Sequence, residues 1–306
     1  MIKNQVRYPP QNLLLFIVIS LATIIVGYLI GGAVVTGLYG KNILEDITML
    51  KLSNPDMPNA LWILQLVSTT IPIMAASLIF AFYIAKDPHS YLLPSFNFNW
   101  VLIIIVFCVM IISAPLIECL SNINQKLQMP PFLAALQRWM RQTEDQAQRL
   151  TTVLLQMNTV GQLIFRVLVV GLLTSIVEEF MFRGCVQTIL LKWFKNPHIA
   201  IAVTAAMFSA FHMEFFGFLP RMMLGMLFGY FVYYSGSIWT AVWGHFINNG
   251  TAVVVSYLFQ NKKITVNPDD THIFNWSIYL FSLIIVLFLL YLYRNIAMGK
   301  KQSLQV

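Results

Sequence analysis

Two adjacent glutamates and an arginine lie within an apolar stretch of the chain. Glu178 and Glu179 occur in the sequence Thr-Ser-Ile-Val-Glu-Glu-Phe-Met-Phe-Arg-Gly, in which Arg183 follows Glu179 by four residues. On a helix Glu179 and Arg183 share one face, with the acid on the N-terminal side, which is the better order for an ion pair. Successive helix residues point about 100° apart, so Glu178 faces another direction. The spacing therefore predicts a Glu179–Arg183 pair and a free Glu178 carboxylate suited to act as a general base.

Two histidine motifs follow on later apolar segments. His212 ends the sequence Phe-Ser-Ala-Phe-His, and His245 begins His-Phe-Ile-Asn-Asn, which places Asn249 four residues after it. Because lipid offers no hydrogen-bond partner to such side chains, we expect them to meet Glu178 in one pocket. A carboxylate, two imidazoles and an amide supply a base for water, a proton carrier and donors for an oxyanion. The combination predicts a hydrolytic site.

Each motif also has a purely structural interpretation. Glu178, Glu179 and Arg183 could form a charge cluster at the end of a helix. A single histidine in an apolar helix is usually a packing residue whose polar atoms are satisfied locally. The catalytic interpretation depends on the motifs occurring together on neighbouring segments.

The elements that must position these side chains are membrane-spanning helices. Apolar residues make up 58% of the 306 residues and charged residues 10%, whereas soluble domains carry about 25% charged residues. A span needs roughly 20 apolar residues. The charge-poor segments predict an all-α, polytopic transmembrane bundle of about eight spans, at 12–39, 61–85, 100–121, 161–191, 199–212, 219–235, 238–260 and 276–293.

The predicted spans divide the chain into three parts of one integral membrane unit. Residues 1–158 hold the N-terminal spans and a segment at 122–158 that is amphipathic at helical spacing. For this segment, an interfacial helix and a helix packed on the protein's own core are both open interpretations. Residues 159–260 are the predicted catalytic core, and residues 261–306 hold a loop, the last span and a basic tail.

Basic residues flank the predicted spans at both ends of the chain. Lys3 and Arg7 precede the first span, and Arg294, Lys300 and Lys301 follow the last. With an even number of spans, the positive-inside rule predicts that both termini are cytoplasmic. We expect a multi-pass protein of the cell membrane, specifically a bacterial inner membrane. The net charge of +7 fits attraction to lipid headgroups. The sequence has no basic patch interleaved with aromatic residues, so nothing in it indicates nucleic-acid binding.

The three motifs together resemble those of the CPBP family of intramembrane proteases. Glu-Glu-x-x-x-Arg at 178–183, Phe-x-x-x-His at 208–212 and His-x-x-x-Asn at 245–249 occur in the family's order on successive segments. The family includes the type II CAAX prenyl endopeptidases and bacterial relatives linked to bacteriocin self-immunity. The resemblance, which covers about 150–260, implies a membrane-embedded endopeptidase acting on a peptide or lipidated protein substrate in the membrane.

The resemblance also implies roles for the four residues of the predicted pocket. Glu178 would activate the attacking water, with His212 assisting. His245 and Asn249 would stabilise the oxyanion. These roles imply a reaction in which water attacks the peptide bond without a covalent enzyme intermediate.

The resemblance leaves the cofactor open. Glu179 and Arg183 would hold the shape of the site. The family has been described as metalloproteases. In that case Glu178, His212 and His245 could supply three zinc ligands and leave one open position. The sequence lacks the His-Glu-x-x-His motif, and a glutamate–water mechanism that needs no metal is the preferred interpretation.

Two other functions are compatible with the same residues. A non-catalytic membrane binding protein or bacteriocin self-immunity protein would use the polar pocket to hold a peptide. A proton-coupled transporter would also explain glutamate and histidine inside spans, although the sequence shows none of the inverted repeats that would support it.

Overall fold

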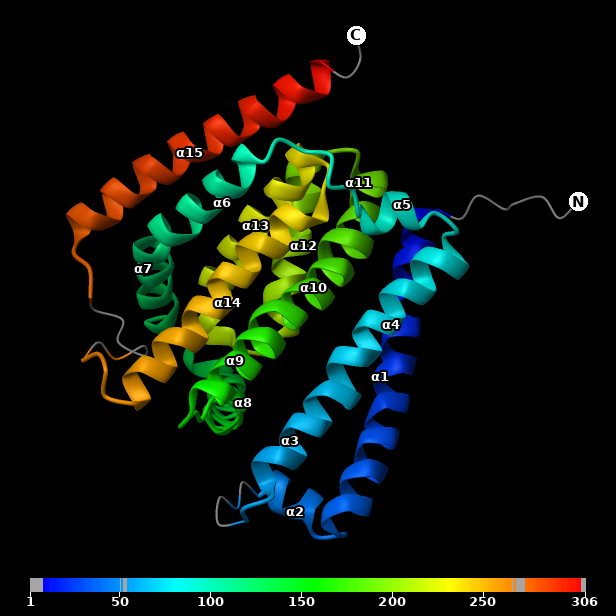
Figure 1. The fold of residues 1–306 in the computed structure, drawn as a ribbon, viewed down its shortest axis with the longest axis vertical. Helices are drawn as coiled ribbons and strands as arrows, with labels where there is room; N and C mark the ends of the chain where they lie inside the picture. Colours follow the sequence, from blue (N-terminus) through cyan, green and yellow to red (C-terminus); the bar gives the residue numbers. More distant parts are fainter. Residues whose placement is uncertain (1–7, 50, 52–53, 266, 268–272, 304–306) are drawn as a thin grey trace, which may run out of the picture.

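The computed structural model describes all residues except 1–7, 50, 52–53, 266, 268–272 and 304–306. Lys3 and Arg7, on which the orientation prediction depends, lie outside the described residues, as do the side chains of Lys300 and Lys301. Within the described part every regular element is a helix and none is a strand (Figure 1). The predicted all-α class is therefore confirmed.

The helices follow one another with short connections. Their bounds are α1 (Pro9–Tyr39), α2 (Ile43–Thr48), α3 (Met57–Gln65), η1 (Leu66–Thr70), α4 (Ile71–Ile79), η2 (Phe80–Ile84), α5 (Pro88–Leu92), α6 (Val101–Ile112), α7 (Ala114–Gln125), η3 (Pro131–Leu133), α8 (Ala134–Leu154), α9 (Val160–Arg166), η4 (Val167–Leu173), α10 (Thr174–Glu179), η5 (Phe180–Val186), α11 (Gln187–Phe194), α12 (Pro197–Phe211), η6 (Phe215–Gly217), α13 (Phe218–Ser235), α14 (Ile238–Gln260) and α15 (Trp276–Ser303).

Of the helices that the structure describes, fewer than the eight predicted are long and apolar enough to count as membrane spans. All eight predicted segments are helical, but among the described residues only five helices are long and apolar enough to cross a membrane, or six if α6 and α7 count as one span. α12 has only 15 residues. α14 has 23 residues but is not among the helices that pass, because its polar site residues lower its hydropathy. The protein is a multi-pass membrane protein, and a count of eight is only loosely supported.

Proline accounts for the break in the third predicted span. α6 and α7 meet at an angle of 43°, and Pro115 stands in the first turn of α7. Proline has no N–H to donate and its ring clashes with the preceding turn, so it bends a helix at this point. Pro72, in the second span, follows the widened π-helical turn η1 without a break.

Small residues let the helices that carry the site pack closely. A Cβ on Gly225 of α13 would lie 3.0 Å from the Cα of Ala205 on α12, and a Cβ on Gly229 would lie 2.8 Å from Ile201. This glycine pair therefore lies at a close contact between α12 and α13. On the other side of the site, a Cβ on Gly171 would lie 3.2 Å from the ring of Phe246 on α14. Helices α12, α13 and α14 can therefore bring polar side chains within reach of the fourth span.

Two apolar cores adjoin where α12 packs on α13 and α10 packs on α14. One core joins α6, α13, α14 and α15, and the other joins α1, α4, η5 and α12. Their largest fully buried side chains include Phe228 and Phe231 in the first core, and Phe16, Phe80 and Phe182 in the second. The helices outside the predicted catalytic core thus contribute to both sides of it.

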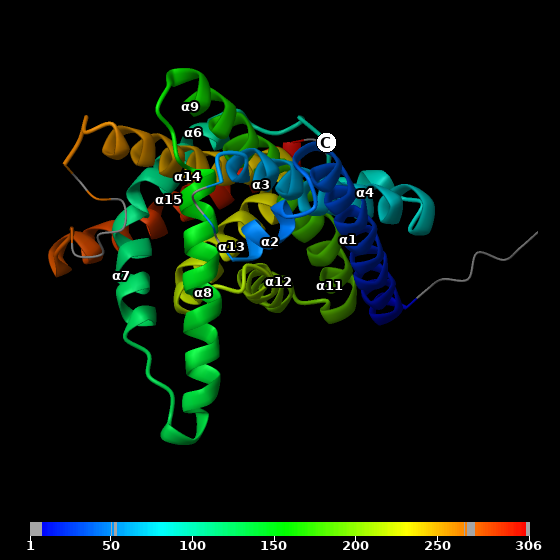
Figure 2. The ribbon, with the colours of Figure 1, turned by 90° about the horizontal axis from the view of Figure 1, so that it is seen from below.

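Helices α7 and α8 project together from the bundle (Figure 2). The C-terminal end of α8 packs on α3, where Val153 contacts Met57 and Leu61. Its N-terminal half, with the turn before it, leaves Phe132 and Trp139 exposed to 82% and 47%. One end of the amphipathic segment therefore packs on the protein, and the other leaves apolar side chains exposed.

Candidate active site

The fourth span is one continuous helical rod whose middle turn carries both glutamates. α10 ends at Glu179 and lies between the two π-helical stretches η4 and η5. π-helical turns are rare and are found frequently at functional sites, because they change the direction in which the following side chains point. Glu178 and Glu179 consequently stand on a short α-helical stretch between two irregular ones.

Glu179 and Arg183 form the ion pair that their spacing predicts. Arg183 Nη1 donates to Glu179 Oε1 over 2.8 Å, and both side chains are fully buried. The same carboxylate oxygen lies 2.8 Å from Nδ1 of His245. Arg183 also donates from Nη2 to the backbone oxygen of Gly225 over 3.0 Å. One buried network therefore links the fourth span to α13 and α14.

Aromatic rings enclose this network. The Arg183 guanidinium lies 4.5 Å from the ring centroid of Phe208 and 5.3 Å from that of Phe228. His245 stacks on Phe228 with centroids 5.0 Å apart, and His212 meets Phe208 edge to face at 4.9 Å. The rings shield the ion pair from water and pack against both imidazoles.

The two histidines converge on one oxygen of Glu178. Nε2 of His212 and Nε2 of His245 both lie 3.8 Å from Oε2 of Glu178. This oxygen is buried, and no described residue donates a hydrogen bond to it. A distance of 3.8 Å is too long for a direct hydrogen bond, which spans about 2.7–3.2 Å, and it is a separation that a single bridging water can span.

Hydrogen bonds fix the tautomer of each neutral imidazole. Nδ1 of His212 lies 2.8 Å from the backbone oxygen of Phe208, and Nδ1 of His245 faces the Glu179 carboxylate. Both partners are acceptors, so Nδ1 carries the hydrogen in each ring and Nε2 of a neutral ring carries the lone pair. Two lone pairs and the Glu178 carboxylate therefore face one another.

Asn249 does not join this convergence directly. It lies one helical turn after His245 on α14, and its Nδ2 donates to the backbone oxygen of Val170 over a long 3.4 Å. Its Oδ1 accepts from Nδ2 of Asn248 over 3.1 Å. Since the bond to Val170 is long, a modest rotation of the Asn249 amide would release its donor.

The side chains around Glu178 have the atom types that bind zinc, but they are not arranged to bind it. A carboxylate oxygen and two imidazole nitrogens, each held by a hydrogen bond at Nδ1, are the groups found in zinc sites. In the described part of the chain, however, no three His, Cys, Asp or Glu side chains are arranged to hold a metal ion. As they stand, Glu178, His212 and His245 would have to move to bind one.

Two residues that the sequence did not single out hold the loop after His212. Asn124 of α7 is buried; its Nδ2 donates to the backbone oxygen of Phe215 over 2.9 Å, and its Oδ1 accepts from the backbone N–H of Leu219 over 2.7 Å. Glu144 of α8 accepts from the backbone N–H of Phe216 over 2.9 Å. We call these two side chains the loop clamp. Its only sequence signal is a polar residue near the end of α7 and another in the middle of α8.

A cavity of about 610 Å³ lies between α7, α8, the loop and the first turns of α13. Its lining includes Asn248, which bonds to Asn249, and Arg221, whose charge acts on both Glu178 and His212. Arg221 forms an ion pair with Glu214 across the loop. The cavity is therefore next to the candidate site.

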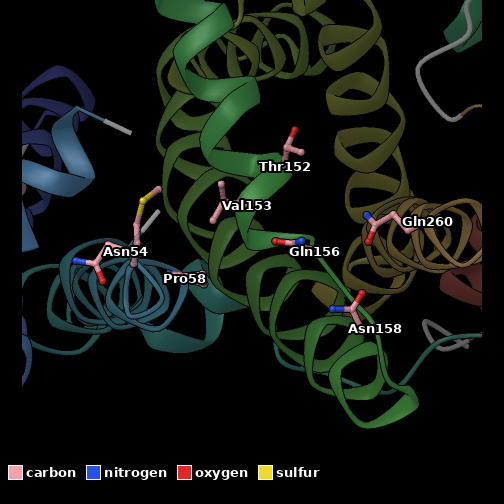
Figure 3. A pocket seen from close by; sticks show the side chains of 8 residues that line it. Asn54, Pro58, Thr152, Val153, Gln156, Asn158 and Gln260 are labelled. Atoms are coloured by element: carbon pink, nitrogen blue, oxygen red, sulfur yellow. The ribbon is translucent and has the colours of Figure 1, made fainter. Parts of the chain in front are cut away.

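A second cavity of similar volume contains none of the predicted site residues. In Figure 3 the green end of α8 lies between the first turn of α3 and the last turn of α14, and the lining includes the polar side chains of Asn54, Gln156 and Gln260. The Gln260 amide already accepts from Met157 N and donates to Leu155 O. This cavity lies between helices, and none of the described side chains that line it is ionisable.

Comparison with known proteins bears on the part of the chain that holds this site. Neither the curated proteins nor the solved structures contain a match to the chain. Residues 160–251 match a family model described as type II CAAX prenyl endopeptidase Rce1-like. All six predicted site residues lie within the matched range, and the Rce1-like match is consistent with the CPBP family of intramembrane proteases.

Proposed function

We propose that this protein is an intramembrane endopeptidase in which Glu178 activates a water molecule for attack on a peptide bond. The family match supports an intramembrane protease of the CAAX type. The observation that carries the mechanism is the convergence of two imidazole nitrogens on one unpartnered oxygen of Glu178, at 3.8 Å each. A water there can reach Glu178 Oε2 and a histidine at about 2.8 Å each, which is normal hydrogen-bond length.

In the proposed reaction, the water oxygen attacks the carbonyl carbon while its proton passes to Glu178, assisted by Nε2 of His212. The C–N bond then breaks, and the same proton is delivered to the leaving nitrogen. The products are a new carboxylic acid and a new amine. General base catalysis of this kind contributes typically 10²–10⁴-fold to the rate.

His245 and Asn249 are the proposed donors to the oxyanion. Because Nδ1 of His245 is engaged by Glu179, His245 donates from Nε2 only when it is protonated, and the Glu179 carboxylate stabilises that imidazolium. Asn249 donates from Nδ2 after it leaves Val170. Arg183 holds Glu179 in place through the buried ion pair.

No metal is required in this proposal. Were zinc bound, Glu178, His212 and His245 would hold it, and it would polarise the carbonyl and acidify the water. The 3.8 Å separations suit a shared water, and the ligand arrangement does not suit a metal. We therefore favour the glutamate–water mechanism.

The proposed substrate is a membrane-associated or lipidated protein, with prenylated proteins as the class that the family suggests. The proposed location is a bacterial inner membrane with both termini in the cytoplasm. No nucleic-acid partner is proposed.

The test is cleavage of a quenched membrane-peptide library by the purified protein and by Glu178→Ala, with and without a zinc chelator. We expect Glu178→Ala to abolish cleavage while it inserts normally, and the native protein to keep its activity with chelator. Glu45→Ala, at an exposed carboxylate on α2, is the control and should cleave normally.

The other outcomes are equally informative. Retained activity in Glu178→Ala would refute the mechanism. Loss of native activity with the chelator would show that a metal is needed. If the native protein cleaves nothing and Glu178→Gln still complements the cellular function, the protein is a binding or immunity protein.

A further inference from the structure

The cavity beside the site has walls from two parts of the chain. α7 and α8 supply one wall and lie outside the matched residues 160–251, whereas the loop, α13 and Asn248 supply the other. Asn248 donates to Asn249 of the predicted site, and the loop begins directly after His212. The cavity therefore lies beside the predicted site.

Most charged groups of the lining are already engaged within the protein. Arg221 pairs with Glu214. Arg141 donates to the backbone oxygen of Gln125 over 2.9 Å and lies 3.2 Å from the ring centroid of Phe216. Glu144 belongs to the loop clamp. These groups hold the walls together and are not free to bind a ligand.

Asp145 is the exception. It lines the cavity and is exposed, and it makes no hydrogen bond or ion pair with any described residue. Two arginines and three carboxylates line the cavity, which gives it a net charge of −1 at neutral pH. Glu214 pairs with Arg221 and Glu144 accepts from the backbone N–H of Phe216, so Asp145 is the one lining carboxylate that no described residue engages.

We propose that this cavity binds the polar peptide segment next to the scissile bond, and that Asp145 receives a lysine or arginine side chain of that segment. The proposal rests on the proposed function and adds the charge preference of the substrate. A cavity of about 610 Å³ falls within the usual range of ligand sites. Because Asp145 lies on α8, outside the matched residues 160–251, the preference is not set by the matched core.

The size of the expected preference follows from the exposure of Asp145. Exposed ion pairs are weak because water and salt screen them, and their strength corresponds to a factor of about two to five in binding. The preference should therefore appear in KM, fall at high salt and leave kcat unchanged. Replacing Asp145 with lysine should reverse the charge preference, so that an acidic residue is favoured.

The experiment compares quenched peptides that differ only in one residue, lysine, glutamine or glutamate, scanned over five positions on each side of the cleaved bond. The native protein should favour lysine at one or two adjacent positions, Asp145→Asn should lose the preference, and Asp145→Lys should favour glutamate. Asp56→Asn, at an exposed carboxylate outside the cavity, is the matched control. Equal preferences in Asp145→Asn and Asp56→Asn would overturn the proposal.

Photocrosslinking separates this proposal from the proposed function. A benzoylphenylalanine at Gln148, which lines the same cavity, should crosslink the lysine peptide more than the glutamate peptide; at Thr152, which lines the other cavity, it should not. Cleavage without crosslinking at Gln148 would overturn the subsite alone. Crosslinking without cleavage would support the subsite and reject the peptidase.

Discussion

The Arg183–Glu179 pair is the most deeply buried charged contact among the residues described here. Both side chains are fully buried, and a charge left alone in such a place has no water to stabilise it. Breaking a buried pair by removing one partner typically costs about 3–5 kcal/mol. We expect Arg183→Ala to lower the free energy of unfolding by this amount, measured by denaturant or thermal unfolding in detergent.

The contrast with an exposed ion pair tests the reason for this loss. Lys51 pairs with Asp46 over 3.0 Å at the surface, and Lys51→Ala should change stability far less than Arg183→Ala. A double variant, Glu179→Gln with Arg183→Met, removes both charges and should recover part of the loss. Equal losses in Lys51→Ala and Arg183→Ala would show that burial does not decide the effect.

Sequence spacing predicted contacts within one helix better than contacts between helices. The Glu179–Arg183 pair followed from helical periodicity, because four residues fix the distance between two side chains. The meeting of His212 and His245 at Glu178 followed only from the argument that polar groups in lipid must find partners. Asn124 and Glu144 could not be predicted in this way, because their partners are backbone groups far away in the sequence.

At the scale of the helices, close packing depends on which atoms of the neighbouring helix face each glycine. A Cβ on Gly225 would press on the backbone of Ala205 at 3.0 Å, and Gly225 also supplies the carbonyl that accepts from Arg183. We expect Gly225→Ala to destabilise the protein by about 1–3 kcal/mol, since overpacking forces backbone shifts, and to lower kcat. Unfolding and cleavage assays on the same preparations measure both effects.

Gly32 provides the matched control for this substitution. It lies within α1, and nothing stands within 4 Å of the Cβ that alanine would add. Alanine is favoured over glycine in a helix interior by about 0.5–1 kcal/mol, so Gly32→Ala should be neutral or stabilising and should leave cleavage unchanged. A loss in Gly32→Ala as large as that in Gly225→Ala would show that close packing of α12 and α13 is not the cause.

The loop clamp connects α7 and α8 to catalysis. Asn124→Leu keeps the side-chain volume but leaves Leu219 N–H and Phe215 O unpaired, at about 1–3 kcal/mol for each buried group. Because the held loop follows His212, we expect kcat to fall in Asn124→Leu while KM for short peptides changes little. The measurement is steady-state cleavage at a temperature where the variant remains folded.

Two comparisons show whether the clamp positions the loop or only stabilises the protein. Asn124→Asp can still accept from Leu219 but cannot donate to Phe215, so its kcat should lie between those of the native protein and Asn124→Leu. Gln146→Leu, at an exposed position of α8, should behave as native. If kcat follows thermal stability alone across these variants, the clamp has no positioning role.

The number of spans shows where sequence reasoning reaches its limit at the level of elements. Apolar composition located every long apolar helix, but it could not separate a spanning helix from a short one such as α12, because burial among neighbouring helices also favours apolar residues. The polar residues that mark α14 as part of the candidate site also lower its mean hydropathy below that of a typical span. Helix existence was therefore predictable, and helix placement relative to the bilayer was not.

At the scale of the whole molecule, the matched core depends on the first half of the chain. Met181, Phe182 and Cys185 share a core with Phe16 of α1 and Phe80 at the end of the second span. The loop clamp belongs to α7 and α8. A fragment that starts at α9 would expose this core and lose both clamp residues, although it would keep every residue of the catalytic motifs.

We therefore expect residues 159–306 expressed alone to insert into membranes without cleaving peptides, and co-expression of residues 1–158 to restore cleavage. The break falls between Asn158 and Thr159, which are both exposed. Thr159 caps α9 with its own side chain, so the second fragment keeps its helix start. Cleavage is measured after co-purification through a tag on one fragment. Asn124→Leu in the first fragment should weaken restored activity, because the clamp acts through contacts and not through chain continuity. Full activity of residues 159–306 alone would show that the motifs need no support from the N-terminal half.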